Sequence, residues 1–388
     1  MLIKRELDLS INHSFFLFGP RGTGKSTLLS GIADPSKMLV LNLLNSDVRL
    51  VLEKSPHRLV DMVESAKAVD WVVIDEIQYV PELLNEVHLL MEKYPHLNFA
   101  LTGSSARKLR RGQANLLAGR AFSFYLHPLT YRELGTQFQL DSVLQYGSLP
   151  KVFALESPQF KQRFLKSYTN TYLAEEIQAE GIVRNLRGFT HFLQLAAAEN
   201  GNCLNFSNMA NDTGIDSKTI KSYFGILEDT LIGFILPAYH HSIRKRQKTH
   251  PKFYFFDTGV TRALVGTVSN TLVPQSSEYG RLFEQFIVLE LLRMNHYFEA
   301  GYRFSYLASP SMEIDLVIER PGQETLFVEI KSRSDIQPKH LQSLHGVVSD
   351  THNSAGICIC QEPIRRVSNG ITICPWQEME KVVFTRET

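Results

Sequence analysis

The 388-residue sequence predicts an α/β fold: a parallel sheet at the N-terminal end, then helical segments, then a second and smaller α/β module. Three observations predict it. Apolar runs rich in β-branched and aromatic residues alternate with helical segments over residues 1–130, which is typical of a parallel sheet covered on both faces. A glycine-rich loop joins the first run to the first helix. Near the C-terminus, a long helical segment precedes three further strand-like runs.

Length and composition limit the classes of protein that fit. A chain of this length is too long for one ordinary core, so we expect two or three domains. Hydrophobic residues make up 44% and charged residues 21%, as in soluble globular proteins, and the net charge of +1 leaves nucleic-acid binding to local patches. The four cysteines form no Cys-x-x-Cys pair, and no apolar run reaches membrane-spanning length. We expect a cytoplasmic protein with reduced thiols and no membrane association.

The glycine-rich loop fits the phosphate-binding pattern G-x-x-x-x-G-K-S. Its residues are Gly19, Pro20, Arg21, Gly22, Thr23, Gly24, Lys25, Ser26 and Thr27. A strand-like run, residues 14–18, precedes it, and a helical segment, residues 26–33, follows. Glycines let the backbone N–H groups face phosphates, and the helix start adds its positive dipole end. Lys25 would reach the β- and γ-phosphates and Ser26 would ligate Mg²⁺, so the sequence predicts ATP or ADP with Mg²⁺.

A buried run, residues 71–74, ends in Asp75 and Glu76. This is the Walker B pattern, in which Asp75 would support Mg²⁺ and Glu76 would orient and deprotonate the attacking water. A pair of helix-capping carboxylates is the alternative interpretation. A strand at residues 38–44 intervenes between the loop and Asp75, an arrangement of ATPases that carry this extra glutamate.

Two further positions are candidates for the same site. The strand at residues 98–101 is followed by Thr102 and Ser104, either of which could sense the γ-phosphate, although a plain strand-end turn fits equally well. Arg120 closes a basic segment and could be an arginine finger acting within the chain or on a neighbouring one. A solvated basic helix explains Arg120 as well. Residues 121–126 are the fifth strand candidate.

Several motifs occur together and in order. They are Gly19-Pro20-Arg21 with Gly24-Lys25-Ser26, Val73-Ile74-Asp75-Glu76-Ile77-Gln78, Leu101-Thr102-Gly103-Ser104-Ser105, His127-Pro128-Leu129 with Glu133, Tyr146-Gly147-Ser148-Leu149-Pro150 and Pro251-Lys252-Phe253-Tyr254-Phe255-Phe256-Asp257-Thr258-Gly259. The chain thereby resembles AAA+-type ATPases of bacteria and archaea whose C-terminal half is a widespread domain of unknown function. That family usually has a second glycine where this chain has Ser148. The resemblance implies an AAA+-like P-loop NTPase sheet of the ASCE class at residues 1–130, ATP hydrolysis and a homo-oligomer.

The middle of the chain is expected to hold a helical lid or connector, residues 131–190, and a winged helix, residues 191–265. Two short helices, with Ser207 and Ser217 as their expected caps, flank a turn at residues 213–216 in helix-turn-helix spacing. Two strand-like runs and a basic loop follow. DNA-facing candidates are Lys218, Lys221, Arg244, Lys245, Arg246 and Lys248. A protein-interaction role for the same surface stays open.

A polar stretch, residues 266–278, is the expected linker to a last module at residues 279–388. There, Glu284 lies on a helix, Asp315 on a strand, and Glu329 and Lys331 on the next strand. This order resembles restriction-endonuclease-like PD-(D/E)xK nucleases, which implies a second Mg²⁺ site held by the carboxylates, with Lys331 stabilising charge at a phosphate. The fold can persist without cleavage.

The sequence as a whole favours a Mg²⁺-dependent ATPase that acts on DNA. One alternative is a nucleotide-controlled signalling switch with slow turnover, in which the winged helix contacts proteins. Another is a defence or toxin-like effector that cleaves nucleic acid with the C-terminal module.

Overall fold

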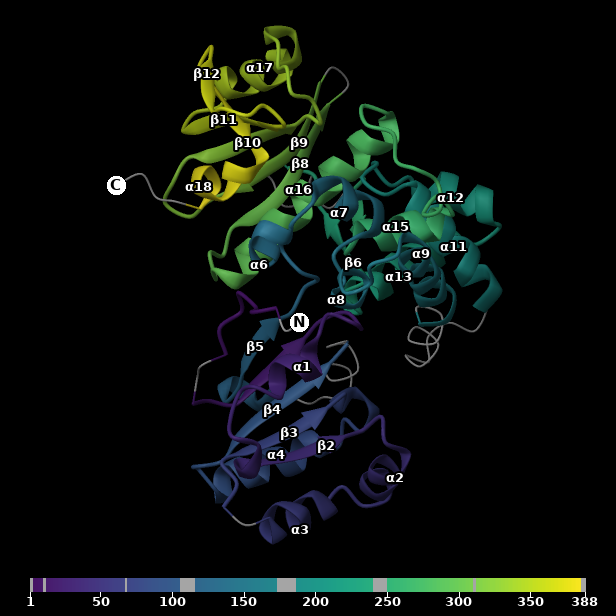
Figure 1. The fold of residues 1–388 in the computed structure, drawn as a ribbon, viewed down its shortest axis with the longest axis vertical. Helices are drawn as coiled ribbons and strands as arrows, with labels where there is room; N and C mark the ends of the chain where they lie inside the picture. The colour runs from purple at the N-terminus through teal and green to yellow at the C-terminus, as the bar shows by residue number, and fades with distance from the viewer. Residues whose placement is uncertain are drawn as a thin grey trace. The chain divides into compact units, whose positions relative to one another are not determined.

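The computed structural model describes residues 3–9, 12–66, 68–104, 116–172, 186–239, 250–309 and 312–384 (Figure 1). The chain divides into two compact units. The N-terminal unit is Met1–Leu129 with the short pieces Leu149–Lys151 and Ile226–Ile232, and the C-terminal unit is the remainder. Among the described residues, no helix combines the length and the apolar character needed to cross a bilayer.

The N-terminal unit is built on a five-stranded sheet. Its strands are β1 Phe15–Phe18, β2 Met38–Asn42, β3 Trp71–Asp75, β4 Asn98–Gly103 and β5 Phe122–Tyr125. Every pairing is parallel and the order is β2-β3-β4-β1-β5. The predicted α/β class with a parallel sheet is confirmed. Because the strands are parallel, the loops after β1, β3 and β4 all leave from the same edge of the sheet.

The spatial order of these strands differs from their order along the chain, in which β2 comes between the glycine-rich loop and Asp75 as expected. The strand that intervenes between β1 and β3 is β4, whereas β2 lies at the edge beside β3. Sequence order does not fix spatial order when each strand is joined to the next by a helical crossover. The consequence is that Thr102, on β4, lies directly between the glycine-rich loop and the end of β3.

Helices cover this sheet. They are α1 Lys25–Leu29, α2 Ser46–Lys54, α3 Arg58–Ser65 and α4 Leu83–Lys93, with 3-10 turns at η1 Pro35–Lys37, η2 Ile77–Tyr79 and η3 Leu116–Gly119. The expected helical stretch after β2 is two helices, because Pro56 cannot continue a helix. Leu52 of α2, Val63 of α3 and Val87 of α4 pack with Val72 and Ile74 of β3 in one buried cluster. In Figure 1, α4 lies along the sheet.

Helices dominate residues 130–265. They are α6 Tyr131–Leu134, α7 Leu140–Tyr146, α8 Pro150–Phe153, α9 Pro158–Ser167, α11 Leu186–Ala198, α12 Phe206–Thr213, α13 Ser217–Asp229 and α15 Thr258–Val265, with short turns at η4 Gly135–Gln137 and η5 Tyr168–Tyr172. Strands β6 Gly233–Leu236 and β7 Lys252–Phe255 pair antiparallel.

The helix-turn-helix spacing is present, but both expected caps were wrong. Asn205 caps α12 by accepting hydrogen bonds from the N–H groups of Ser207 and Asn208. Asp216 caps α13 by accepting from the N–H groups of Lys218 and Thr219. Each helix starts earlier than expected, because Asn, Asp and Ser cap helices about equally well and the backbone geometry here places Asn205 and Asp216 at the helix starts.

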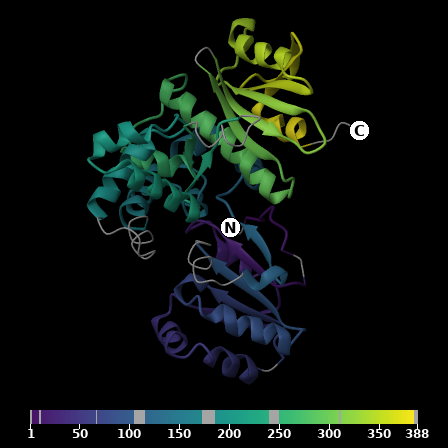
Figure 2. The same cartoon turned by 180° about the vertical axis from the view of Figure 1, so that it is seen from behind.

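The C-terminal sheet has six strands. They are β8 Arg303–Ser309, β9 Met312–Glu319, β10 Thr325–Ile330, β11 Ser354–Cys360, β12 Arg366–Ser368 and β13 Ile371–Pro375, in the order β12-β13-β11-β10-β9-β8. Its helices are α16 Ser277–Tyr297, α17 Gln342–Asp350 and α18 Met379–Val383, with 3-10 turns at η6 Pro338–Leu341 and η7 Trp376–Glu378. Figure 2 shows this module from behind. Phe327 and Cys358 pack with Leu344 of α17 in one buried cluster.

A buried polar network ties the start of this unit to α15 and α16. Asp257 caps α15 and also accepts a hydrogen bond from the Ser148 N–H at 2.8 Å. Arg293 of α16 donates to Glu290 at 2.7 Å and to the Phe256 carbonyl at 3.0 Å. Glu290 in turn accepts from the Tyr131 N–H. Two of the sequence motifs, around Gly147 and Asp257, therefore serve packing: a Cβ on Gly147 would overlap the Asp257 carboxylate.

Candidate nucleotide-binding site

The glycine-rich loop leaves β1 at Gly19 and enters α1 at Lys25. Gly19 lies so close to the Leu126 carbonyl that a Cβ would clash with it. Gly22 and Gly24 have φ values of 85° and 95°, in the left-handed region that costs other residues about 1–2 kcal/mol. The glycines are therefore needed for the loop conformation that the motif predicts.

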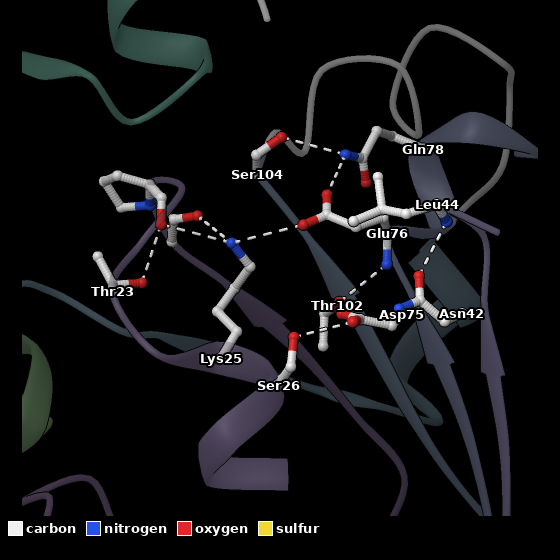
Figure 3. A network of polar contacts seen from close by, with 12 residues as sticks. Thr23, Lys25, Ser26, Asn42, Leu44, Asp75, Glu76, Gln78, Thr102 and Ser104 are labelled. Atoms are coloured by element: carbon white, nitrogen blue, oxygen red, sulfur yellow. Dashed lines mark hydrogen bonds and ion pairs between the residues drawn. The ribbon is translucent and has the colours of Figure 1, made fainter. Parts of the chain in front are cut away.

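Lys25 is 5% exposed and its ammonium group lies at the centre of the site. It donates hydrogen bonds to the carbonyls of Gly19 at 2.8 Å and Pro20 at 3.4 Å. Its Nζ is 3.9 Å from Glu76 Oε1 (Figure 3). The buried cation thus lies between the loop and the end of β3, where it could meet the charge of a phosphate.

Ser26 and Asp75 meet across the sheet edge. The Ser26 hydroxyl donates to Asp75 Oδ2 at 2.8 Å. A hydroxyl and a carboxylate are hard oxygen ligands of the kind that Mg²⁺ prefers, so the donor set fits this metal.

Glu76 follows β3 in a left-handed conformation, with φ of 62°. This conformation is uncommon for a residue with a side chain and is held here by its surroundings. The Glu76 N–H donates to Thr102 Oγ1 at 2.9 Å, and the same hydroxyl donates to Asp75 Oδ1. Thr102 thus fixes the backbone of one carboxylate residue and the side chain of the other.

Gln78 is a residue of this site that the sequence reasoning missed. It is 5% exposed, and its amide nitrogen donates to Glu76 Oε2 at 2.5 Å and to Ser104 Oγ at 3.1 Å (Figure 3). Gln78 closes one of the motifs that carry the family resemblance, which could have flagged it, but its contact with Glu76 depends on the turn at Glu76.

Arg120 lies apart from these contacts. It is 44% exposed in its side chain and pairs with Glu92 of α4 at 2.9 Å. Another arginine, Arg5, supports the loop from outside by donating to the carbonyls of Thr23 at 2.7 Å and His127 at 2.6 Å. Arg5 precedes the motif by many residues, so its sequence position gave no hint of this contact.

In the C-terminal unit, the structure places Asp315, Glu329 and Lys331 side by side. Lys331 forms an ion pair with Glu329, two residues before it in the sequence. The Asp315 carboxylate accepts a hydrogen bond from the Ile330 N–H at 2.7 Å. Burial and the nearby charge of Asp315 raise the pKa of Glu329 to about 7. The carboxylates of this cluster therefore act on one another electrostatically.

Glu284 joins the same cluster through two residues of the Pro251–Gly259 motif, which the sequence did not place near the carboxylates. Tyr254 donates to Glu284 at 2.6 Å, and Lys252 is 3.6 Å from Glu284 and 2.7 Å from Glu313. Burial lowers the pKa of Lys252, but the charges of Glu284 and Asp315 raise it above its usual value. Over the residues that the structure describes, no three or more His, Cys, Asp or Glu side chains are grouped so as to hold a metal ion.

The predicted DNA-facing residues are only partly covered by the structure. Lys218 and Lys221 are exposed on α13. Arg244, Lys245, Arg246 and Lys248 lie outside the described residues.

Three protein families match parts of this chain. Residues 12–135 match the AAA domain, residues 137–271 match a domain of unknown function (DUF8612), and residues 279–379 match another domain of unknown function (DUF4143). The expected combination of an AAA-type P-loop domain with a C-terminal domain of unknown function is confirmed. The matched AAA range holds the loop, Asp75 and Glu76.

Similar proteins occur in distant organisms. Uncharacterized proteins of Mycobacterium tuberculosis and Haemophilus influenzae are 24% and 25% identical, over 82% and 80% of this chain and 70% and 80% of theirs. Among solved structures, AMPPCP-bound DnaA from Aquifex aeolicus aligns over 56% of this chain and 82% of its own, with 13% identity and a TM-score of 0.30. A TM-score this low does not establish a shared fold.

Proposed function

We propose that this chain is a Mg²⁺-dependent ATPase whose hydrolysis is coupled to DNA. The observation that carries the hydrolytic part is the meeting of four side chains at one sheet edge. Ser26 Oγ lies 2.8 Å from Asp75 Oδ2, and Lys25 Nζ lies 3.9 Å from Glu76 Oε1. A buried cation, a hydroxyl with a carboxylate, and a second carboxylate are the groups that phosphoryl transfer to water requires.

Each residue has a separate part in this reaction. Lys25 would turn from the loop carbonyls to neutralise the β- and γ-phosphates. Ser26 and Asp75 would hold Mg²⁺, which supplies positive charge to the phosphate oxygens when bound. Glu76 takes a proton from water as the water oxygen forms a bond to the γ-phosphorus. The bond from that phosphorus to the bridging oxygen breaks, and ADP leaves with the bonding electrons.

Nucleotide binding tests the first half of the proposal. Lys25→Ala should weaken the binding of a fluorescent ATP analogue at least 10-fold, because the variant removes a buried, charge-assisted hydrogen bond to phosphate. Lys37→Ala is the matched control, since Lys37 is exposed and pairs with Asp70 on the surface. Equal affinities for the two variants would refute the assignment of the loop.

DNA is the proposed partner because of the helix-turn-helix spacing, the exposed Lys218 and Lys221, and the basic stretch of sequence that contains Arg244, Lys245 and Arg246. Replacing these last three cations with Ala should weaken DNA binding and lower its salt dependence. On duplex DNA, the slope should become about 0.9 smaller for each phosphate that is no longer neutralised. Binding by fluorescence anisotropy from 50 to 200 mM salt measures both. An unchanged affinity would remove this surface from the proposal and favour protein contacts.

A second candidate function is metal-dependent cleavage of nucleic acid at the acidic cluster around Asp315, although the carboxylates among the described residues form no group of three that would hold a metal ion as they stand. Its basis is the convergence of Glu284, Asp315, Glu329 and Lys331 in the order of a PD-(D/E)xK site. Cleavage of labelled DNA and RNA with Mg²⁺ or Mn²⁺ should then disappear in Lys331→Ala and persist in Lys25→Ala. Loss of cleavage in both variants, or cleavage that survives Lys331→Ala, would contradict it.

A further inference from the structure

The position of the Gln78 amide lowers the stability of the folded chain. The side chain is 5% exposed, and its carbonyl oxygen is buried without a hydrogen-bond partner in the described part of the chain. A buried acceptor without a partner lowers stability, whereas an apolar side chain of the same size would not. Stability alone therefore does not account for a glutamine here.

Both N–H groups of the Gln78 amide nitrogen donate hydrogen bonds, and both acceptors belong to the nucleotide site. One N–H donates to Glu76 Oε2 at 2.5 Å and the other donates to Ser104 Oγ at 3.1 Å. Only a nitrogen can donate to a carboxylate, so this contact fixes which end of the amide is which. Figure 3 shows the amide nitrogen between the two side chains.

Glu76 is thus held from three directions. Its backbone is fixed by Thr102, Oε1 lies 3.9 Å from Lys25, and Oε2 accepts from Gln78. The contact with Lys25 would end when this lysine turns to phosphate. The contact with Gln78 lies within the turn that follows β3 and involves no residue of the glycine-rich loop.

Building on the proposed ATPase function, we propose that Gln78 is a positioning residue for Glu76. Its amide keeps the carboxylate aimed at the attacking water during hydrolysis, and Ser104 orients the amide. Ser104 thereby acts through Gln78 rather than as a direct sensor of the γ-phosphate. Because proton transfer from water needs a base at hydrogen-bond distance, a carboxylate that swings freely would be a poorer base.

The test replaces Gln78 with Met, which has a similar shape and no donor. We expect kcat for ATP to fall about 10- to 100-fold, the range that misplacing a catalytic group produces, with KM and nucleotide affinity changed less than about 3-fold. Ser104→Ala should give a smaller fall in kcat. Gln78→Glu, which places a second carboxylate beside Glu76, should lower kcat at least as much as Met. Asn85→Leu, at an exposed amide on α4, is the control.

A double variant separates positioning from a structural effect. In the Glu76→Gln background, Gln78→Met should cause no further loss of single-turnover rate, because the group that it positions is already gone. The same fractional loss in both backgrounds, or a kcat within 2-fold of wild type for Gln78→Met, would overturn the inference. If Glu76→Gln itself hydrolyses ATP normally, the ATPase proposal fails instead, so the two failures are distinguishable.

Discussion

Gly19 shows how a single missing side chain shapes the loop. Its Cα faces the Leu126 carbonyl closely enough that a Cβ would have to displace backbone. We expect Gly19→Ala to destabilise the N-terminal unit and to weaken ATP binding at least 10-fold, because the carbonyl that receives Lys25 also belongs to Gly19.

The control for this prediction is another glycine of the same segment. A Cβ on Gly31 would meet the Leu28 carbonyl at 3.6 Å, an ordinary contact. Thermal unfolding and ATP-analogue binding should therefore be close to wild type for Gly31→Ala. Similar losses in the two variants would show that the loop geometry is not the cause.

The sequence predicts those residues of the nucleotide site that make local contacts or belong to a motif with a fixed spacing. Lys25 and Ser26 follow their glycines directly, and Asp75 with Glu76 ends an apolar run. The contacts of Gln78 and Arg5 could not be predicted, because the first depends on the left-handed turn at Glu76 and the second on His127, which follows β5 far along the chain. Lys252 joined the acidic cluster only through tertiary packing.

At the scale of elements, α16 carries a titratable group that the fold buries. Burial raises the pKa of Glu290 to about 7, against the lowering effect of the Arg293 charge, from an ordinary value of 4.5. The folded chain therefore keeps a proton that the unfolded chain releases between about pH 4.5 and 7. Where the folded state binds more protons, the free energy of unfolding falls as pH rises.

Glu290→Gln removes this titration, so the fall in unfolding free energy between pH 5 and pH 7 should become smaller. Urea unfolding followed by Trp376 fluorescence, in a Trp71→Phe background, measures it for the C-terminal unit. Glu324→Gln, at an exposed turn residue, is the control. An unchanged pH dependence in Glu290→Gln would contradict the assignment.

Most of the helices and strands could be predicted from the sequence. The five strands of the first sheet and the long helix α16 follow from apolar runs and periodicity, which are local properties. The spatial order of the strands could not be predicted from the sequence. In the sheet, β4 rather than β2 lies between β1 and β3. The caps at Asn205 and Asp216 were misplaced because several polar residues compete at each helix start and only the backbone geometry decides among them.

For the whole molecule, the resemblance to AAA+ ATPases predicts a homo-oligomer, in which Arg120 could serve a neighbouring copy or its own. Arg120 is exposed and its contact with Glu92 is a surface ion pair, which costs little to break. Arg120→Ala should then lower turnover by about 10³-fold or more while ATP binding persists.

Mixing two inactive variants tests this arrangement. Arg120→Ala supplies an intact Glu76, and Glu76→Gln supplies an intact Arg120, so mixed assemblies should regain part of the ATPase activity. Recovery in the mixture supports a finger that acts between copies. No recovery, with size-exclusion chromatography showing mixed assemblies, would place Arg120 outside the reaction or within its own chain.

The most direct test of the central claim is steady-state phosphate release from ATP with Mg²⁺, measured alone and with single-stranded, duplex and branched DNA. The wild-type chain should turn over, with a rate raised by one DNA form. Glu76→Gln should bind ATP and lose about 10²- to 10⁴-fold in rate, and Glu82→Gln, at the exposed start of α4, should match wild type. No turnover under any condition, or equal rates for wild type and Glu76→Gln, would contradict the account.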